Sequence, residues 1–136
     1  MARVFPGPVV SVNRGPLLSD IDLQARVVHP QGTGTEVLEE GFLVAPSDVL
    51  TVTATLYNMT QSTTVGAVSV NANNFSATLI NDNEWTEDLI GRNFLINVPA
   101  SNFTAYGKYR LIIDLTLTGG GRRRWGHDYN VEQIEP

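Results

Sequence analysis

Hydrophobic and polar residues alternate with a period of two along most of the chain, most regularly between residues 107 and 131. The apolar side of the first run in this stretch consists of Tyr109, Leu111, Ile113, Leu115 and Leu117. Ile112 is the one apolar residue on the other side of that run. A period of two is that of a half-buried β-strand. Because residues 119–121 are glycines that allow the chain to reverse, and the alternation then resumes from Trp125, the pattern predicts an antiparallel hairpin.

Shorter runs of the same alternation precede the hairpin, and turn-forming residues separate them at intervals of about ten residues. The runs lie at 21–27, 37–44, 50–57, 68–72, 75–79 and 94–98. The run at 37–44 is interpreted as one bulged strand or two short ones. Residues 81–92 break the period in a way that is typical of a single helical turn. Seven to nine short strands with regular turns predict an all-β fold, an antiparallel β-sandwich.

The alternation also predicts which side chains form the core. Residues on the apolar side of the most regular strands should pack between the two sheets of a sandwich. The predicted core residues are Leu50, Val52, Leu56, Ile96, Val98, Leu111, Ile113 and Leu115.

The first sixteen residues differ from the rest of the chain, because Pro6, Pro8 and Pro16 flank a short apolar run. Proline cannot donate a ladder hydrogen bond, so a central strand is disfavoured here. We therefore expect residues 1–16 to form an extended arm and residues 17–136 a single domain. Such an arm packs along its own domain or on a neighbouring subunit. We expect it to bind a neighbour and to contribute more to assembly than to folding, through Val4, Phe5, Val9, Val10 and Val12.

Length and charge narrow the classes of function. A chain of 136 residues suits one domain, and its formal charge of −5 argues against general capture of nucleic acid or of a membrane surface. The chain has no cysteine, so no disulfide framework supports the fold. We find no apolar run of signal-peptide or membrane-spanning length, and expect a protein that is made in the cytoplasm.

The residues that could carry chemistry form no complete constellation. His29 and His127 lack a third nearby metal ligand, and the acidic segment 81–88 lacks the spacing of a calcium loop, so we expect it to be solvated and metal-free. No serine or threonine lies in a nucleophile motif with a spaced histidine and acid. The glycines at 119–121 are followed by arginines rather than by Lys-Ser/Thr, which indicates a hairpin tip and not a phosphate loop. We therefore predict a protein that is not an enzyme and has no cofactor and no small-molecule substrate.

The most distinctive charged feature is a run of three arginines and a tryptophan at the start of the last strand. It consists of Arg122, Arg123, Arg124 and Trp125. Arginine pairs bidentately with carboxylates and is enriched at protein interfaces. On an acidic protein, this cluster predicts a docking site for an acidic partner surface. The alternative is that the arginines only keep an edge strand soluble.

Several short patterns follow one another in an order that resembles a known family. They are Leu56-Tyr57-Asn58, the strand from Val65 to Val70, the strand from Phe94 to Pro99, Gly107-Lys108-Tyr109-Arg110, and Leu115-Thr116-Leu117 with its glycine turn. Over residues 48–133 this order resembles the small immunoglobulin-like domains of tailed-bacteriophage virions, which occur in baseplate upper proteins, neck proteins and capsid decorations.

This resemblance implies an immunoglobulin-like β-sandwich with a structural role in a virion. The expected function is that of a capsid cement or decoration protein, or of a tail-associated subunit, that clamps neighbouring subunits together. The expected partners are other virion structural proteins or further copies of the chain as a homo-oligomer. The expected location is the virion, after synthesis in the host cytoplasm.

A second hypothesis is a module that binds glycans or a host surface. Exposed aromatic side chains serve as stacking platforms in such modules. The candidates for this role are Trp85, Tyr57 and Tyr106.

Overall fold

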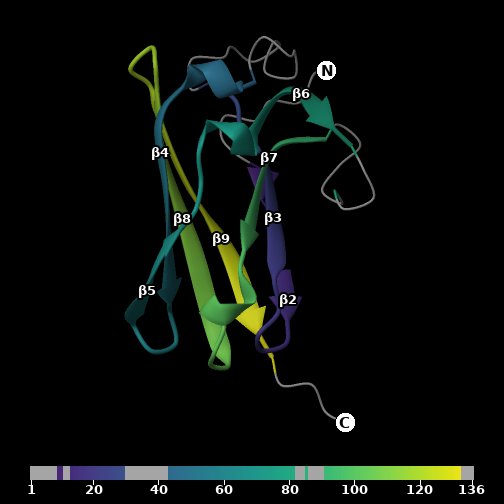
Figure 1. Cartoon of the computed structure of the whole chain (residues 1–136), viewed down its shortest axis with the longest axis vertical. Helices are drawn as coiled ribbons and strands as arrows, with labels where there is room; N and C mark the ends of the chain where they lie inside the picture. Colours follow the sequence, from purple (N-terminus) through teal and green to yellow (C-terminus); the bar gives the residue numbers. More distant parts are fainter. Residues whose placement is uncertain (1–8, 11–12, 30–42, 82–84, 86–90, 133–136) are drawn as a thin grey trace.

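The protein is an all-β sandwich of two packed sheets (Figure 1). The computed structural model describes residues 9–10, 13–29, 43–81, 85 and 91–132. The first sheet contains, in spatial order, β1 (Val9–Val10), β3 (Ile21–Arg26), β7 (Arg92–Val98) and β6 (Phe75–Ile80). The second contains β2 (Asn13–Gly15), β9 (Arg122–Val131), β8 (Gly107–Leu117), β4 (Val49–Asn58) and β5 (Thr63–Val68). Short 3-10 turns lie at Pro46–Asp48, Ala72–Asn74 and Ala100–Asn102.

The order of the strands is that of an immunoglobulin-like domain. Immunoglobulin sandwiches place strands A, B, E and D in one sheet and G, F and C in the other, and variable-type domains add C′ beside C. Strands β1, β3, β7 and β6 follow the first order, and β9, β8, β4 and β5 follow the second. The predicted fold class is therefore confirmed. Within the described residues, no helix is long and apolar enough to cross a membrane.

The predicted closing hairpin is formed by β8 and β9, which run the length of the domain (Figure 1). Tyr109, near the start of β8, makes the hydrogen bonds known as a tyrosine corner in immunoglobulin folds. Its hydroxyl donates to the Ala105 carbonyl oxygen at 2.9 Å and accepts from the Ala105 amide at 3.3 Å. Two residues later, where antibody domains carry a cysteine, Leu111 is fully buried. A buried leucine thus stands where antibody domains carry one of the two cysteines of their disulfide.

Most of the predicted core lies between the sheets. The members that are at most 1% exposed are Leu56, Ile96, Val98, Leu111, Ile113 and Leu115. Val52 is partly buried against this core, whereas Leu50 is 61% exposed, so the prediction for Leu50 was wrong. The pairing of β4 with β8 shifts register between Val49 and Thr51, and this irregularity takes Leu50 out of the alternation. Val49 packs against the core in its place.

The described part of the predicted arm belongs to the sandwich itself. Val9–Val10 pair antiparallel with β3, and Asn13–Gly15 pair in parallel with β9. These residues follow Pro6 and Pro8 and precede Pro16, so their amides are free to join the two ladders. The described residues before Pro16 therefore pair with both sheets of the domain, and binding of residues 1–16 to a neighbouring subunit stays a prediction. Val4, Phe5 and Val12 lie outside the described residues.

Some predictions fall wholly or largely outside the described residues. They concern the strand at 37–44, of which Leu43 forms an isolated bridge to Val28, and the segment 81–92 with its helical turn and acidic run. The strand predicted at 68–72 is displaced, because β5 already begins at Thr63 and ends at Val68.

Candidate protein-binding surface

The second sheet turns one face away from the core, and we call the part of it formed by β4, β8 and β9 the outer face. On β8 the outward residues are Lys108, Arg110, Ile112, Asp114 and Thr116. On β9 they are Arg122, Arg124, Gly126, Asp128 and Asn130. The β8–β9 register pairs these two sets one to one, so the outer face consists of five rows of opposed residues. On the other side of β8, β4 adds Thr53, Thr55 and Tyr57, which carry no charge.

Two of these rows are ion pairs. Arg110 donates two hydrogen bonds to Asp128, from Nε to Oδ1 at 2.7 Å and from Nη2 to Oδ2 at 3.2 Å. This bidentate bond is the main reason why the pKa of Asp128 is lowered and that of Arg110 is raised. Arg124 Nε lies 3.5 Å from Asp114 Oδ1 in the second pair. All four side chains remain about 40% exposed or more, so these pairs fix charges in place more than they stabilise the fold.

An apolar row separates the two ion pairs. Ile112 lies opposite Gly126. A Cβ atom at position 126 would lie 3.3 Å from Ile112 Cδ1 and 3.4 Å from Arg110 Cδ. Because Gly126 has no side chain, Ile112 and the stem of Arg110 lie across β9. The middle of the outer face is therefore low in relief and apolar, with charges above and below it.

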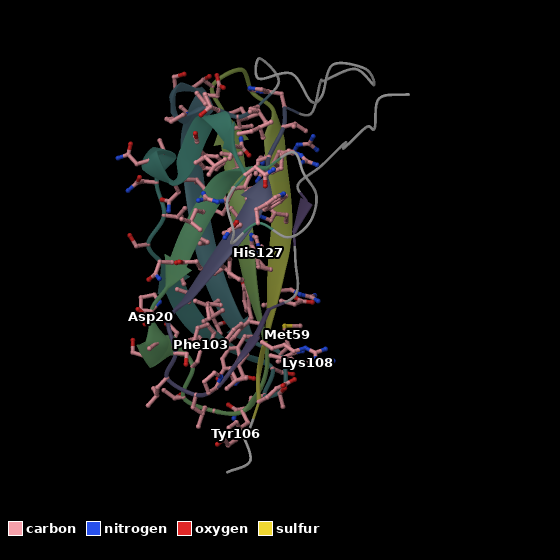
Figure 2. The ribbon with its side chains drawn as sticks, turned by 90° about the vertical axis from the view of Figure 1, so that its right-hand side faces the viewer. Asp20, Met59, Phe103, Tyr106, Lys108 and His127 are labelled. Carbon is pink, nitrogen blue, oxygen red and sulfur yellow. The ribbon has the colours of Figure 1, made fainter. Side chains whose placement is uncertain are left out.

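A shallow hollow of about 310 Å³ lies at one end of the outer face. Met59, Lys108, Arg110, Asp128 and Asn130 contribute to its lining. Met59 is 47% exposed, and its amide donates to the Lys108 carbonyl oxygen at 2.8 Å. Figure 2 shows Met59 and Lys108 side by side at this end of the sheet. The hollow combines apolar and charged groups, as the rims of protein interfaces do.

The predicted arginine–tryptophan cluster is divided between the two faces of β9. Arg122 and Arg124 point outward, whereas Arg123 Nε donates to the Val28 carbonyl oxygen at 3.0 Å, and burial lowers its pKa. Trp125 is buried, and its ring meets Phe94 edge-on at 5.3 Å between centroids. Successive residues of a strand point to opposite faces, so four consecutive residues cannot form one patch. This corrects the predicted docking site and leaves Arg122 and Arg124 on the outer face.

Both histidines are engaged in structural contacts. Trp125 Nε1 donates to His127 Nε2 at 2.8 Å, so that nitrogen must be deprotonated. Burial lowers the pKa of His127 from 6.5 to about 4, and the nearby carboxylate of Asp128 opposes this shift only in part. His29 Nε2 lies 3.1 Å from Asp48 Oδ2. In the described part of the chain, no group of three or more histidines and acids is placed to hold a metal ion.

The aromatic residues proposed for glycan stacking do not share one environment. Trp85 is only 6% exposed, so its ring is not a platform, which corrects that expectation. Its ring lies under Arg26, whose Cζ atom is 6.0 Å from the ring centroid. Tyr57 is half-buried on β4. Tyr106 is 48% exposed and lies at the lower end of the domain in Figure 2.

One polar cluster was not predicted. Asn93 on β7 is buried and makes three hydrogen bonds with backbone groups: Oδ1 accepts from the Val27 amide at 2.6 Å, and Nδ2 donates to the carbonyl oxygens of Val27 and Val44 at 2.9 and 3.0 Å. The neighbouring Arg26 is fully buried and donates from Nη1 to the Gly91 carbonyl oxygen at 3.2 Å. Strand alternation alone would place Arg26 on the solvent side, but all residues from 23 to 28 are buried.

Comparisons with known proteins add little to this description. No protein-family model and no curated protein sequence matches the chain. Among solved structures, the chain is similar to the Ig1 domain of mouse SynCAM 2, at 11% sequence identity and a TM-score of 0.36, over 96% of this chain and 100% of that chain. It is also similar to a family 123 glycoside hydrolase from Clostridium perfringens, at 12% identity and a TM-score of 0.44, over 93% of this chain and 23% of that chain. The chain thus spans about a quarter of that enzyme's length, and neither likeness carries an argument about function.

Proposed function

We propose that the protein is a non-enzymatic structural subunit of a tailed-bacteriophage virion, a capsid cement or decoration protein or a tail-associated subunit, that clamps neighbouring subunits through the outer face. The observation that carries this proposal is the outer face itself. It presents Ile112 between two half-exposed ion pairs, Arg110–Asp128 and Asp114–Arg124. An apolar centre with a charged, solvent-accessible rim is the usual composition of a protein interface.

The rigidity of the sheet supports a role in holding subunits. Strand β8 lies in the middle of the sheet and is paired along its whole length, with β9 on one side and β4 on the other. A backbone that is already held in such a sheet needs no further ordering on binding, which reduces the entropic cost of association.

The environment of the ionisable groups favours binding over chemistry. His127 is buried and accepts a hydrogen bond from Trp125, and His29 is paired with Asp48. The hydroxyl of Tyr109 holds the corner at Ala105. These hydrogen bonds hold the fold together. A general acid or base would instead have to be free to exchange protons with a substrate.

The virion setting rests on the sequence resemblance. The patterns around Leu56–Asn58, Phe94–Pro99 and Gly107–Arg110 follow the order found in immunoglobulin-like domains of tailed-phage particles. Repetition of a small clamp around a symmetric particle makes even a weak single contact effective, since many copies act together.

The test is whether the chain is part of purified particles. Virions of the phage whose genome encodes the chain are banded in a density gradient. The amount of the chain in the band is then measured by mass spectrometry. We expect it to co-sediment with particles, and Ile112→Asp to lower its amount about tenfold, which corresponds to about 1.4 kcal/mol. Ala77→Asp is the control, because Ala77 is exposed on β6 in the other sheet and the change in charge is the same. Absence of the chain from banded particles would overturn the proposal.

A further inference from the structure

The charges of the outer face alternate in sign in two directions. Along β8, Arg110 and Asp114 lie on either side of Ile112, and along β9, Asp128 and Arg124 lie on either side of Gly126. The four charges therefore occupy the corners of a rectangle around the apolar row, with equal charges on its diagonals. The two sides of the rectangle that cross from β8 to β9 are the ion pairs Arg110–Asp128 and Asp114–Arg124 within the chain.

A rectangle of this kind is complementary to itself. Consider a two-fold axis in the plane of the outer face that runs across the strands along the Ile112–Gly126 row. Rotation about this axis exchanges the two charged rows. Arg110 of one copy then faces Asp114 of the other, and Asp128 faces Arg124. In the outermost rows Lys108 faces Thr116, and Asn130 faces Arg122. No like charges are opposed in any of the five rows.

We propose that the outer face binds a second copy of this chain, face to face, about this two-fold axis. The Ile112 side chains of the two copies meet at the axis, and the absence of a side chain at Gly126 keeps the surface low enough for the sheets to approach. An interface that uses the same patch on both partners closes into a dimer. The inference rests on the proposed role of the outer face as a contact surface, and it does not require the virion setting.

The net charge of the chain limits which surfaces of two copies can meet. Two copies that each carry −5 repel one another at most orientations. The ten outward residues of β8 and β9 include four basic side chains, Lys108, Arg110, Arg122 and Arg124, against two acidic ones, Asp114 and Asp128. The outer face thus carries +2, so two copies that meet here keep the surfaces with their excess negative charge apart, and the unlike charges that face one another across the axis offset the repulsion between the two +2 faces.

The size of the sheet sets the expected strength. The three long strands of the outer face, β4, β8 and β9, lie about 4.8 Å apart and are about 33 Å long, which gives an area of about 500 Å². Stable interfaces bury about 800 Å² per partner, and weaker ones bury less. We therefore expect a reversible dimer with a Kd of about 1–100 µM. Because charges face one another across the interface, the Kd should rise with salt concentration.

Sedimentation equilibrium of the full chain tests the proposal, at concentrations up to about 200 µM, above the expected Kd. We expect the unaltered chain and the control Ala77→Asp to form the dimer, and Ile112→Asp to remain monomeric. Far-ultraviolet circular dichroism and thermal unfolding verify that each variant is folded.

A charge exchange tests the axis without changing the composition of the face. The double variant Asp114→Arg with Arg124→Asp keeps the net charge and the ion pair within each chain. About the proposed axis, however, it places an arginine at 114 against Arg110 and an aspartate at 124 against Asp128. We expect at least about a tenfold increase in Kd.

Three results would overturn the proposal. The unaltered chain could remain monomeric at about 200 µM, Ile112→Asp could dimerise as well as the unaltered chain, or the charge exchange could leave the Kd unchanged. The proposed function fails separately, by absence of the chain from banded particles, so the two failures are distinguishable.

Discussion

At the residue scale, single polar side chains make hydrogen bonds at points where the regular pairing of strands ends. Asn93 connects β7 to the backbone at Val27 and Val44, and Tyr109 ties the entry of β8 to Ala105. His127 gives the buried indole of Trp125 its acceptor. Buried polar groups such as these contribute little while they are paired, but they are costly to leave without a partner.

Replacement of Asn93 should show this cost. Asn93→Ala removes the hydrogen bonds that this side chain makes with the Val27 amide and with the carbonyl oxygens of Val27 and Val44. We expect the free energy of unfolding to fall by about 2–4 kcal/mol in urea denaturation. Asn97→Ala on the same strand is the control, because Asn97 is exposed, and it should change stability by less than about 0.5 kcal/mol. Equal effects of the two changes would contradict the assignment.

His127 should make stability depend on pH. Its pKa is lowered to about 4 in the fold from 6.5, so between these values the unfolded chain binds more protons. The free energy of unfolding is therefore not reduced by His127 above pH 6.5. It falls by about 3 kcal/mol in total as the pH is lowered towards 4, because the unfolded chain takes up the proton first. His127→Gln keeps an acceptor for Trp125 but does not titrate. The unaltered chain should lose about 3 kcal/mol more than this variant between pH 7 and pH 4, and parallel curves would refute the claim.

At the element scale, β1 and β2 pair with different sheets, and the position of β2 depends on a small residue. The Cβ atom of an alanine at position 15 would meet the hydroxyl of Tyr129, which is 2% exposed and packed against Phe103. Gly15 therefore permits β2 to lie beside β9.

Gly15→Ala should loosen β2 and lower the free energy of unfolding by about 1–3 kcal/mol. Adding Tyr129→Phe removes the atom that clashes, so the double variant should recover part of that loss. A double-mutant cycle by chemical denaturation measures this coupling. If the two changes are additive, the clash does not govern the position of β2.

The closing hairpin and most of the core were predictable because both are local. Ile113 and Leu115 alternate with polar residues in a long strand, and nothing in their pairing disturbs the period. Leu50 was mispredicted because its shift depends on how β4 pairs with β8, which the local pattern does not contain. The parallel pairing of β2 with β9 joins residues more than a hundred positions apart and has no local signal.

The outer face was only partly visible in the sequence. Ile112 was recognised as the exception on the polar side of its strand, and the alternation of β9 already separates Arg122 and Arg124 from Arg123 and Trp125. The opposition of Arg110 to Asp128 requires the register of the hairpin. That register is fixed by the turn, where the Leu117 amide donates to the Gly121 carbonyl oxygen at 2.8 Å.

At the scale of the whole molecule, we propose that this acidic immunoglobulin-like domain uses the outer face of its second sheet for contact with another protein subunit, and in particular with a second copy of itself. Asn93 connects β7 to the backbone at Val27 and Val44, and the core buries the inward side chains of both sheets. Ile112 and its flanking ion pairs lie on the solvent side of β8 and β9, and we propose that they form the contact.

The most direct measurement is the methyl resonance of Ile112 in an NMR dilution series of the full chain, with isoleucine methyl groups labelled. Ile113, on the same strand but fully buried on the opposite face, is the internal reference. We expect the Ile112 δ1 methyl signal to shift as the concentration rises through about 1–100 µM, while that of Ile113 stays constant. An Ile112 signal that does not move over that range, when other surface signals do, would contradict the claim.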